Sequence, residues 1–173
     1  MFDKKRPVYK LNLKKELKNK KAEMVKDILK SKDKAGDYQK ANYSFEVFTK
    51  YNAYLYDLFI KKSKKLLNKF TIKNLNLKVW CYFTGPDDSE KDIWHNHIRT
   101  SSINSVIYLE TVKKHGIEFE TGKEYWYVEP KNFDLLIFPG FLNHRPVTSS
   151  TRQRISLNLE LKCNEKDKDI FGL

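Results

Sequence analysis

The residues best suited to chemistry in this chain are histidines, and three of the four have a spacing that could bring them together. His95 and His97 lie two positions apart, and His144 follows 49 residues after His95. On a β-strand, residues i and i+2 point to the same face, so His95 and His97 can reach one point. His144 follows the apolar run 135–142, where a turn can aim its ring inward. Three converging imidazoles bind first-row divalent metals and leave positions open for a substrate or O₂.

A second group of chemically interesting residues begins ten positions after His144. Arg154 and Ser156 share one face of a strand predicted over 154–161, whose other face is apolar. A buried guanidinium is costly unless an anion neutralises it. No carboxylate close in sequence does so, since Glu160 lies six residues on. A guanidinium beside a hydroxyl suits carboxylate geometry, so this pair predicts a bound carboxylate ligand.

In type, order and spacing, these residues resemble the motif of the 2-oxoglutarate/Fe(II)-dependent dioxygenases over roughly residues 78–161. The resemblance is to the prolyl-hydroxylase-like branch and to short uncharacterised oxygenases of bacteria and phages with a Trp-His-x-His stretch. Segments 79–82, 105–109 and 129–139 carry it besides the histidines. It implies a double-stranded β-helix, a jelly-roll or cupin-like barrel, whose iron ligands would be His95, His97 and His144.

The same resemblance implies a co-substrate site and a reaction. Arg154 and Ser156 would hold the distal carboxylate of 2-oxoglutarate. Tyr108 would hydrogen-bond that carboxylate, and Tyr82 would line the co-substrate or substrate pocket. With Fe(II) and O₂, such an enzyme would convert 2-oxoglutarate to succinate and CO₂ and hydroxylate a C–H bond. The substrate, a small molecule or a protein side chain, is not identified by these residues.

One position departs from the family pattern. His97 stands where the family usually has a carboxylate, so three neutral imidazoles leave the metal one negative charge short. One alternative is that His95 or His97 is not a ligand and that a carboxylate arrives from elsewhere in the chain. Another is a cupin-like three-His metal dioxygenase that does not use 2-oxoglutarate. That second alternative gives no reason for Arg154 and Ser156.

The elements that would position these residues can be predicted from hydrophobic periodicity. Helical spacing predicts helices over 11–29 and 44–70, packed together on one sheet. Strands are predicted over 75–81, 93–98, 103–109, 117–119, 125–128, 135–138 and 154–161. Many short strands are typical of a sandwich or barrel, so the expected fold is mainly β. The remaining histidine, His115, is predicted to be an exposed turn residue.

The expected organisation is a single domain over 1–173, with a basic helical part over 1–70, a β core over 71–162 and a tail over 163–173. The chain has 34 Lys+Arg and 22 Asp+Glu, a net charge of +12. Residues 1–70 hold 20 basic and 8 acidic residues, and the rest hold 14 of each, so the whole excess is N-terminal. Lysine dominates, which favours a solvated helix face over a nucleic-acid surface rich in arginine and stacking aromatics. A non-enzymatic β-barrel module whose basic arm binds nucleic acid is the third interpretation.

Several classes of protein are disfavoured by composition. No stretch approaches the ~18 apolar residues of a membrane span, and residues 1–6 are not followed by the apolar segment of a secretory signal. The two cysteines, Cys81 and Cys163, make no disulfide framework. A soluble, cytoplasmic protein without a membrane partner is therefore expected.

Overall fold

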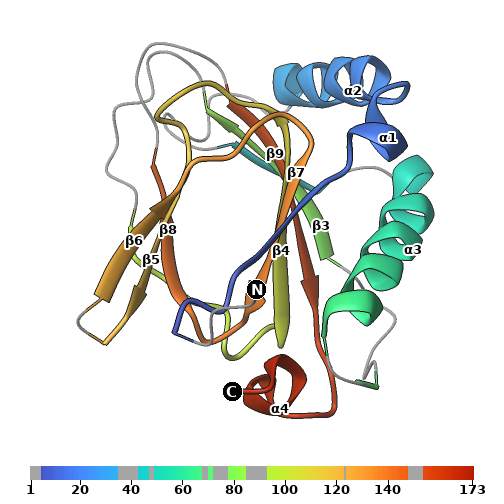
Figure 1. Cartoon of the computed structure of the whole chain (residues 1–173). Coiled ribbons are helices and arrows are strands. Elements are labelled where there is room, and N and C mark those ends of the chain that lie inside the picture. The colour runs from blue at the N-terminus through green and yellow to red at the C-terminus, as the bar shows by residue number, and fades with distance from the viewer. Residues whose placement is uncertain are drawn as a thin grey trace.

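The computed structural model describes residues 5–34, 43–46, 49–67, 70–71, 78–84, 93–122, 124–147 and 154–173, without the side chains of 31–34, 43–46, 49–50, 52 and 78–84. The elements, labelled in Figure 1, are β1 (Tyr9–Asn12), α1 (Lys14–Leu17), α2 (Lys21–Lys34), β2 (Tyr43–Glu46), α3 (Thr49–Leu66), β3 (Lys78–Thr84), β4 (Ile103–Glu110), β5 (Ile117–Thr121), β6 (Glu124–Val128), β7 (Asp134–Pro139), β8 (Asn143–Pro146), β9 (Arg154–Leu161) and α4 (Asp167–Phe171).

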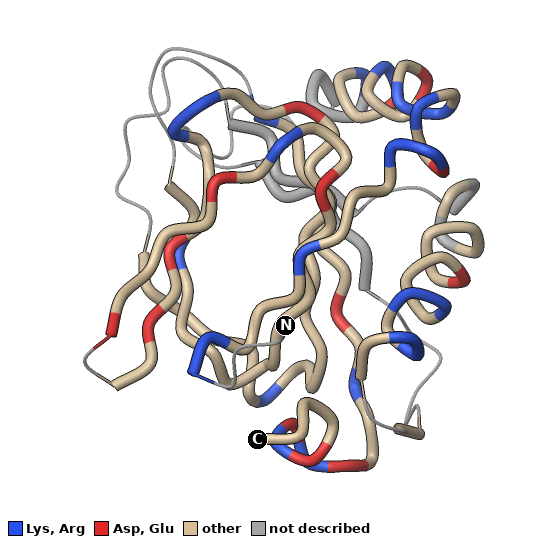
Figure 2. Tube along the Cα trace, in the orientation of Figure 1, with Lys and Arg blue, Asp and Glu red and all other residues tan. Residues whose placement is uncertain are grey.

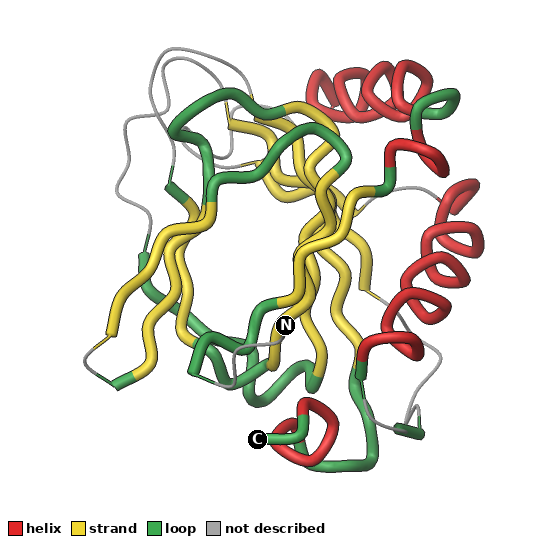
Figure 3. The backbone as a smooth tube through the Cα atoms, viewed as in Figure 1, coloured by secondary structure: helices red, strands yellow, loops and turns green. Residues whose placement is uncertain are grey.

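Two antiparallel sheets form most of the molecule and face one another (Figures 1 and 3). The larger sheet has the strand order β1-β7-β4-β9-β3-β2, and the smaller has the order β6-β5-β8. Every pair of neighbouring strands in both sheets is antiparallel. The protein is therefore mainly β, as predicted, and its paired antiparallel sheets are consistent with a jelly-roll-like fold.

The central strands of the larger sheet are buried on both faces, and alternate residues serve different layers. In β4, Ile103, Ile107 and Leu109 pack with the helices, whereas Val106 and Tyr108 pack with the smaller sheet. This division follows from the two-residue period of a strand. The helix-facing residues of β7 and β9 are Leu135, Ile137, Ile155, Leu157, Leu159 and Leu161. The other face of these strands is left to line the space between the sheets.

Helices α1 to α3 cover the face of the larger sheet that points away from the smaller one (Figure 1). Met24 and Ile28 of α2, and Leu55 and Phe59 of α3, are spaced four apart and almost fully buried. Each such side chain contributes about 2 kcal/mol by leaving water. The exposed lysines that the structure describes in this layer are Lys14, Lys15, Lys18, Lys20, Lys26, Lys30, Lys61, Lys64 and Lys65. Figure 2 shows basic residues distributed along the helical segments.

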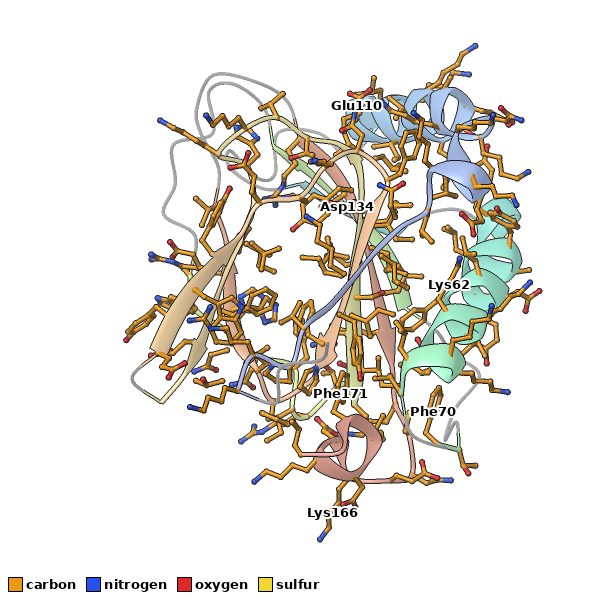
Figure 4. All side chains as sticks on the ribbon, in the orientation of Figure 1. Lys62, Phe70, Glu110, Asp134, Lys166 and Phe171 are labelled. Carbon is orange, nitrogen blue, oxygen red and sulfur yellow. The ribbon has the colours of Figure 1, made fainter. Side chains whose placement is uncertain are left out.

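The helix predicted over 11–29 is wrong at its start. Tyr9–Asn12 is strand β1, which pairs with β7 at the edge of the larger sheet. The Asn12 Nδ2 atom donates a hydrogen bond to the Asp134 carboxylate at 2.9 Å, and Asp134 is labelled in Figure 4. The backbone partners that β7 offers outweigh local helix propensity, which is a weak preference. The longer helix therefore begins only at Lys21.

The helix predicted over 44–70 also begins later than expected. Residues 43–46 form β2, which pairs with β3, and α3 begins at Thr49. The sequence Tyr43-Ser44-Phe45-Glu46 alternates aromatic and polar residues, which is the two-residue period of a strand. Phe45 falls within the predicted helix, although it belongs to the edge strand of the larger sheet.

Three further segments differ from the prediction. The strand predicted over 93–98 is reduced to one isolated β-bridge, between His95 and His144, and is followed by a turn at 98–100. Strand β8 was not predicted. Within the expected tail, residues 167–171 form α4, which buries Ile170 and Phe171. None of the helices in the described ranges combines the length and apolar character needed to cross a bilayer.

Candidate active site

A cavity of about 190 Å³ lies between the two sheets. Its walls come from β4, β7 and β9 of the larger sheet, from β5 and β8 of the smaller sheet, and from the segment 95–97. Val106, Ile117 and Phe138 contribute apolar surface, while the polar side chains lie on β4, on β9 and around the histidines. A largely apolar hollow with a few convergent polar groups is typical of a small-molecule site.

Strand β9 gives the cavity its polar wall. Arg154, Ser156, Asn158 and Glu160 all line the cavity. The residues between them belong to the core on the helix side of the sheet. On the neighbouring strand β4, Tyr108 lies opposite Ser156 and Asn104 lies opposite Glu160. Arg154 and Glu160 therefore mark the two ends of one polar row on the cavity face.

Backbone hydrogen bonds bring the three predicted histidines together. The backbone N–H groups of His95 and His144 each donate to the other residue's carbonyl, at 3.0 and 2.9 Å. The N–H of His97 donates to the carbonyl of Gly140 at 2.8 Å. Candidate ligand atoms of the three rings all lie within 4.8 Å of one another. The single β-bridge between segment 95–97 and β8 therefore brings the three rings together. The sequence had predicted that a full strand would do so.

An oxygen atom lies within hydrogen-bonding distance of the Nδ1 atom of each of these rings. The His95 Nδ1 atom lies 3.0 Å from the Ile93 carbonyl oxygen, and the His144 Nδ1 atom lies 2.9 Å from the Leu142 carbonyl oxygen. The third partner is a carboxylate: Glu160 Oε1 lies 2.5 Å from the Nδ1 atom of His97. Because these oxygens accept hydrogen bonds, each Nδ1 carries a hydrogen, and Nε2 is the ring atom that remains for a metal.

A lowered pKa keeps two of the rings in the form that a metal requires. His144 is 5% exposed, and burial, aided by the neighbouring His95, lowers its pKa to about 3. The pKa of His95 is also lowered, because neighbouring groups shield its ring from part of the solvent, although the residue as a whole is exposed. A metal binds the neutral imidazole, so both rings offer an unprotonated nitrogen at neutral pH.

The guanidinium of Arg154 is buried without a carboxylate among the described residues. Arg154 is 3% exposed, and its Nη1 atom donates to the Gly116 carbonyl at 3.3 Å. Its Nε atom is buried with no hydrogen-bond partner in the described part of the chain. Burial raises the pKa of Tyr108, and the charge of Arg154 opposes part of that rise. The site therefore combines a fixed cation with a protonated phenol, and both can donate to an anion.

The structure places most of the predicted site residues on one cavity. His95, His97, His144, Arg154 and Ser156 all line it, together with Tyr108. Tyr82 belongs to β3, where its backbone lies opposite Ser156, but its side chain lies outside the described residues.

Glu160 and Asn104 were missed as parts of the site. Asn104 accepts a hydrogen bond from the Ser101 hydroxyl, and its Nδ2 atom has no partner among the described residues. The alternation along β9 could have identified Glu160, because residues 154, 156, 158 and 160 share one face. Glu160 was overlooked because the sequence analysis weighed it only as a partner for Arg154 and judged it too far away in the sequence.

The expectation for His115 was wrong, because the residue is fully buried rather than exposed. Its backbone N–H donates to the Val112 carbonyl at 3.1 Å, which closes the turn before β5. Lys114, with φ of 69°, takes the left-handed corner of that turn. His115 therefore stands at the inward end of the turn and enters the core.

Comparisons with known proteins identify the fold. No family model matches the sequence, and no curated protein matches it. Solved structures do match. A prolyl hydroxylase from Trichoplax adhaerens, in complex with a hypoxia inducible factor peptide fragment, has a TM-score of 0.67 at 12% identity, over 90% of this chain and 83% of that chain. A prolyl-4-hydroxylase from Pseudomonas putida has a TM-score of 0.61 at 13% identity, over 92% and 94%. A protein of Shewanella oneidensis that is named as an oxygenase has a TM-score of 0.66 at 15% identity, over 91% and 82%. The chain therefore has the fold of prolyl hydroxylases and related oxygenases, as the motif resemblance predicted.

Proposed function

We propose that this chain is an Fe(II)- and 2-oxoglutarate-dependent dioxygenase that hydroxylates a C–H bond and releases succinate and CO₂. In this proposal the chain is one domain over 1–173, and residues 71–162 form a double-stranded β-helix. The fold shared with prolyl hydroxylases supports it. One observation carries it: three imidazoles and a buried guanidinium without a carboxylate partner among the described residues line the same cavity.

The donor set suits the metal. His95, His97 and His144 would hold Fe(II) through their Nε2 atoms, because each Nδ1 atom is already engaged by an oxygen. Imidazole nitrogen is a suitable ligand for iron, and three protein ligands leave positions open. When bound, Fe(II) would chelate the 2-oxo acid and activate O₂.

The buried cation suits the co-substrate. Arg154 would pair with the distal carboxylate of 2-oxoglutarate, which would remove the cost, several kcal/mol, of burying an unpaired charge. Ser156 and Tyr108 would donate hydrogen bonds to the same carboxylate, and the raised pKa of Tyr108 keeps its proton available. Tyr82, opposite Ser156 on β3, would add to this end of the pocket.

The apolar wall would protect the reacting groups. Val106, Ile117 and Phe138 line the same cavity as the histidines and Arg154. By excluding water they would strengthen the electrostatic contacts inside and suppress side reactions.

The substrate class is open to a direct search. The Trichoplax adhaerens neighbour is described with a peptide fragment. Protein side chains are therefore tested beside small molecules, starting with proline-containing peptides.

The proposal is tested without knowing the substrate. Purified protein with Fe(II), ascorbate and 2-oxoglutarate is expected to release succinate slowly, because these groups react even when the second substrate is missing. Arg154→Ala is expected to weaken 2-oxoglutarate binding about 10-fold to 100-fold, the cost of losing charged hydrogen bonds, and to keep its metal. The matched control is Arg6→Ala, an exposed arginine outside the cavity.

Two outcomes would contradict the proposal. Metal-loaded protein that binds no 2-oxoglutarate in calorimetry would favour the cupin-like alternative. Equal 2-oxoglutarate affinity in Arg154→Ala and Arg6→Ala would remove the role given to Arg154.

A further inference from the structure

Glu160 is a buried carboxylate that contacts one of the three histidines. It is 7% exposed, and its Oε1 atom lies 2.5 Å from His97 Nδ1. Among the described residues, the imidazole of His97 contacts this carboxylate, and Glu160 lies opposite Asn104 in the sheet. A buried carboxylate is costly unless a donor or a positive charge compensates it. Its place on the cavity wall therefore calls for a functional account.

The charge of the metal centre supplies that account. Three imidazoles are neutral ligands, so a divalent ion among them would lack the negative charge that a carboxylate ligand normally brings. A carboxylate that accepts a hydrogen bond from a ligating imidazole passes part of its charge to the ring and raises its basicity. Glu160 has the position to do this for His97.

We propose that Glu160 is a positioning residue that supplies the missing negative charge of the metal centre through Nδ1 of His97. This proposal rests on the metal centre of the proposed function. Glu160 fixes the His97 ring so that Nε2 meets the metal, and makes that ring the most electron-rich of the three. His95 and His144 donate to neutral backbone carbonyls, so a full negative charge stands behind His97 alone.

The geometry favours this role over direct ligation. The cluster whose donor atoms lie within 4.8 Å of one another contains the three histidines, and Glu160 is not part of it. Its oxygen is instead engaged by Nδ1 on the far side of the His97 ring from Nε2. Glu160 therefore contacts a metal ligand and is not itself one.

The test measures Co(II) binding, which needs no O₂ and no substrate. Glu160→Gln keeps an oxygen that can accept the hydrogen bond but removes the charge, and Glu160→Ala removes both. Co(II) affinity is expected to fall about tenfold in Glu160→Gln and up to about 100-fold in Glu160→Ala, the range for partners of metal-bound histidines. The visible absorption of bound Co(II) should also shift. Glu124→Gln, an exposed carboxylate at the end of β6, is the matched control and should bind Co(II) like the wild type.

A double-mutant cycle separates the role from a general loss of folding. In a His97→Ala background, Glu160→Gln should cause no further loss of Co(II) affinity beyond about twofold, because the two residues act through one contact. Thermal unfolding of each metal-free variant checks that it is folded. If Glu160→Ala is unfolded, Glu160→Gln decides the question, since it preserves the shape of the side chain.

The outcomes are distinguishable. Co(II) affinity in Glu160→Gln and Glu160→Ala within about twofold of the control would overturn the proposal. A large loss in Glu160→Ala with none in His97→Ala would make Glu160 the ligand itself, which also overturns it. Co(II) binding that depends on Glu160 but comes without 2-oxoglutarate turnover would contradict the proposed function and leave this role intact. Wild-type protein that takes up no metal would overturn both.

Discussion

The oxygen acceptors at the three Nδ1 atoms decide which nitrogen of each cavity histidine is free. Two are backbone carbonyls and one is a carboxylate. A neutral imidazole can carry its hydrogen on either nitrogen, and an acceptor at Nδ1 selects the form with a free Nε2. The Phe138 ring packs edge-on against His144, with centroids 4.9 Å apart, and limits ring rotation. The ligand set is therefore preorganised by contacts outside the metal position.

The lowered pKa of His144 makes the metal-free protein sensitive to acid. Its folded pKa is about 3, below the ordinary value of 6.5. Between these values the unfolded chain binds a proton that the folded chain does not, so stability falls as pH falls through this window. The expected slope for one such group is about 1.4 kcal/mol per pH unit.

Urea unfolding of metal-free protein at several pH values below neutrality measures this slope. The His144→Gln variant removes the titrating group, so its stability should decline less steeply with acid than that of the wild type. Parallel pH profiles for the two proteins would mean that His144 is protonated in the folded state.

At the scale of elements, the connection between β7 and β8 holds the histidine segment in place. The Gly140 carbonyl accepts from His97 N–H, and the Gly140 N–H donates to the Ser102 carbonyl at 3.0 Å. A Cβ atom at Gly140 would overlap the backbone carbonyl of Ser101, which cannot move aside as a side chain could. Glycine is needed here because two backbones approach closely.

Two glycine substitutions should separate close approach from backbone strain. Gly140→Ala should cost about 2 kcal/mol or more and weaken metal binding, because the segment that carries His97 must shift. Gly122→Ala should cost about 1 kcal/mol through its φ of +59°, with no described atom within 4 Å of the new Cβ, and should leave metal affinity unchanged. Unfolding midpoints and Co(II) titrations of both variants make the comparison. Normal metal affinity in a folded Gly140→Ala protein would contradict the role given to the close approach of the Gly140 and Ser101 backbones.

The two faces of β9 should also respond differently to alanine. Leu157 is fully buried on the helix side, so Leu157→Ala should cost about 3 kcal/mol and leave 2-oxoglutarate binding unchanged. Ser156 faces the cavity, so Ser156→Ala should weaken 2-oxoglutarate binding with a smaller loss of stability. Urea unfolding and calorimetry give the two readouts. Equal effects on ligand affinity would show that the faces are not independent.

Strands with a strong apolar pattern were predictable, and strands set by distant partners were not. β4, β7 and β9 were found within one residue of their ends because their alternation or apolar runs are local signals. β1 and β8 are four residues long and mostly polar, so their pairing partners decide them. Glu160 was overlooked for a related reason: its contact with His97 joins residues far apart in sequence.

At the scale of the whole molecule, the larger sheet separates two regions of different character. Most of the exposed lysines that the structure describes within residues 1–70 lie on the helical layer on one side, and the cavity lies on the other. Lys62 of α3, labelled in Figure 4, pairs with Glu16 at 2.6 Å and ties α3 to α1. The N-terminal charge is thus carried by a layer that supports the sheet and does not line the cavity.

The first strand and the last helix of the described chain both contact β7. β1 pairs with β7 along one edge, α4 contacts β7, and the Tyr9 and Phe171 rings have centroids 6.4 Å apart. Figure 4 labels Phe171 on α4 at the end of the larger sheet. Phe171 is 3% exposed, whereas Leu173 is 39% exposed. The C-terminal helix is therefore part of the core.

Removing the Phe171 ring should show how much the packing of α4 contributes to the free energy of unfolding. Phe171→Ala should lower the free energy of unfolding by about 3 kcal/mol, and Leu173→Ala should change it by less than about 0.5 kcal/mol. Chemical unfolding measures both, and Co(II) titration below the unfolding temperature should give wild-type affinity in each. Equal unfolding midpoints for the two variants would mean that residues 167–173 are a loosely attached tail. A loss of metal affinity in folded Phe171→Ala would mean that strain passes along β7 to Phe138 and His144, because β7 is the strand that joins the two regions.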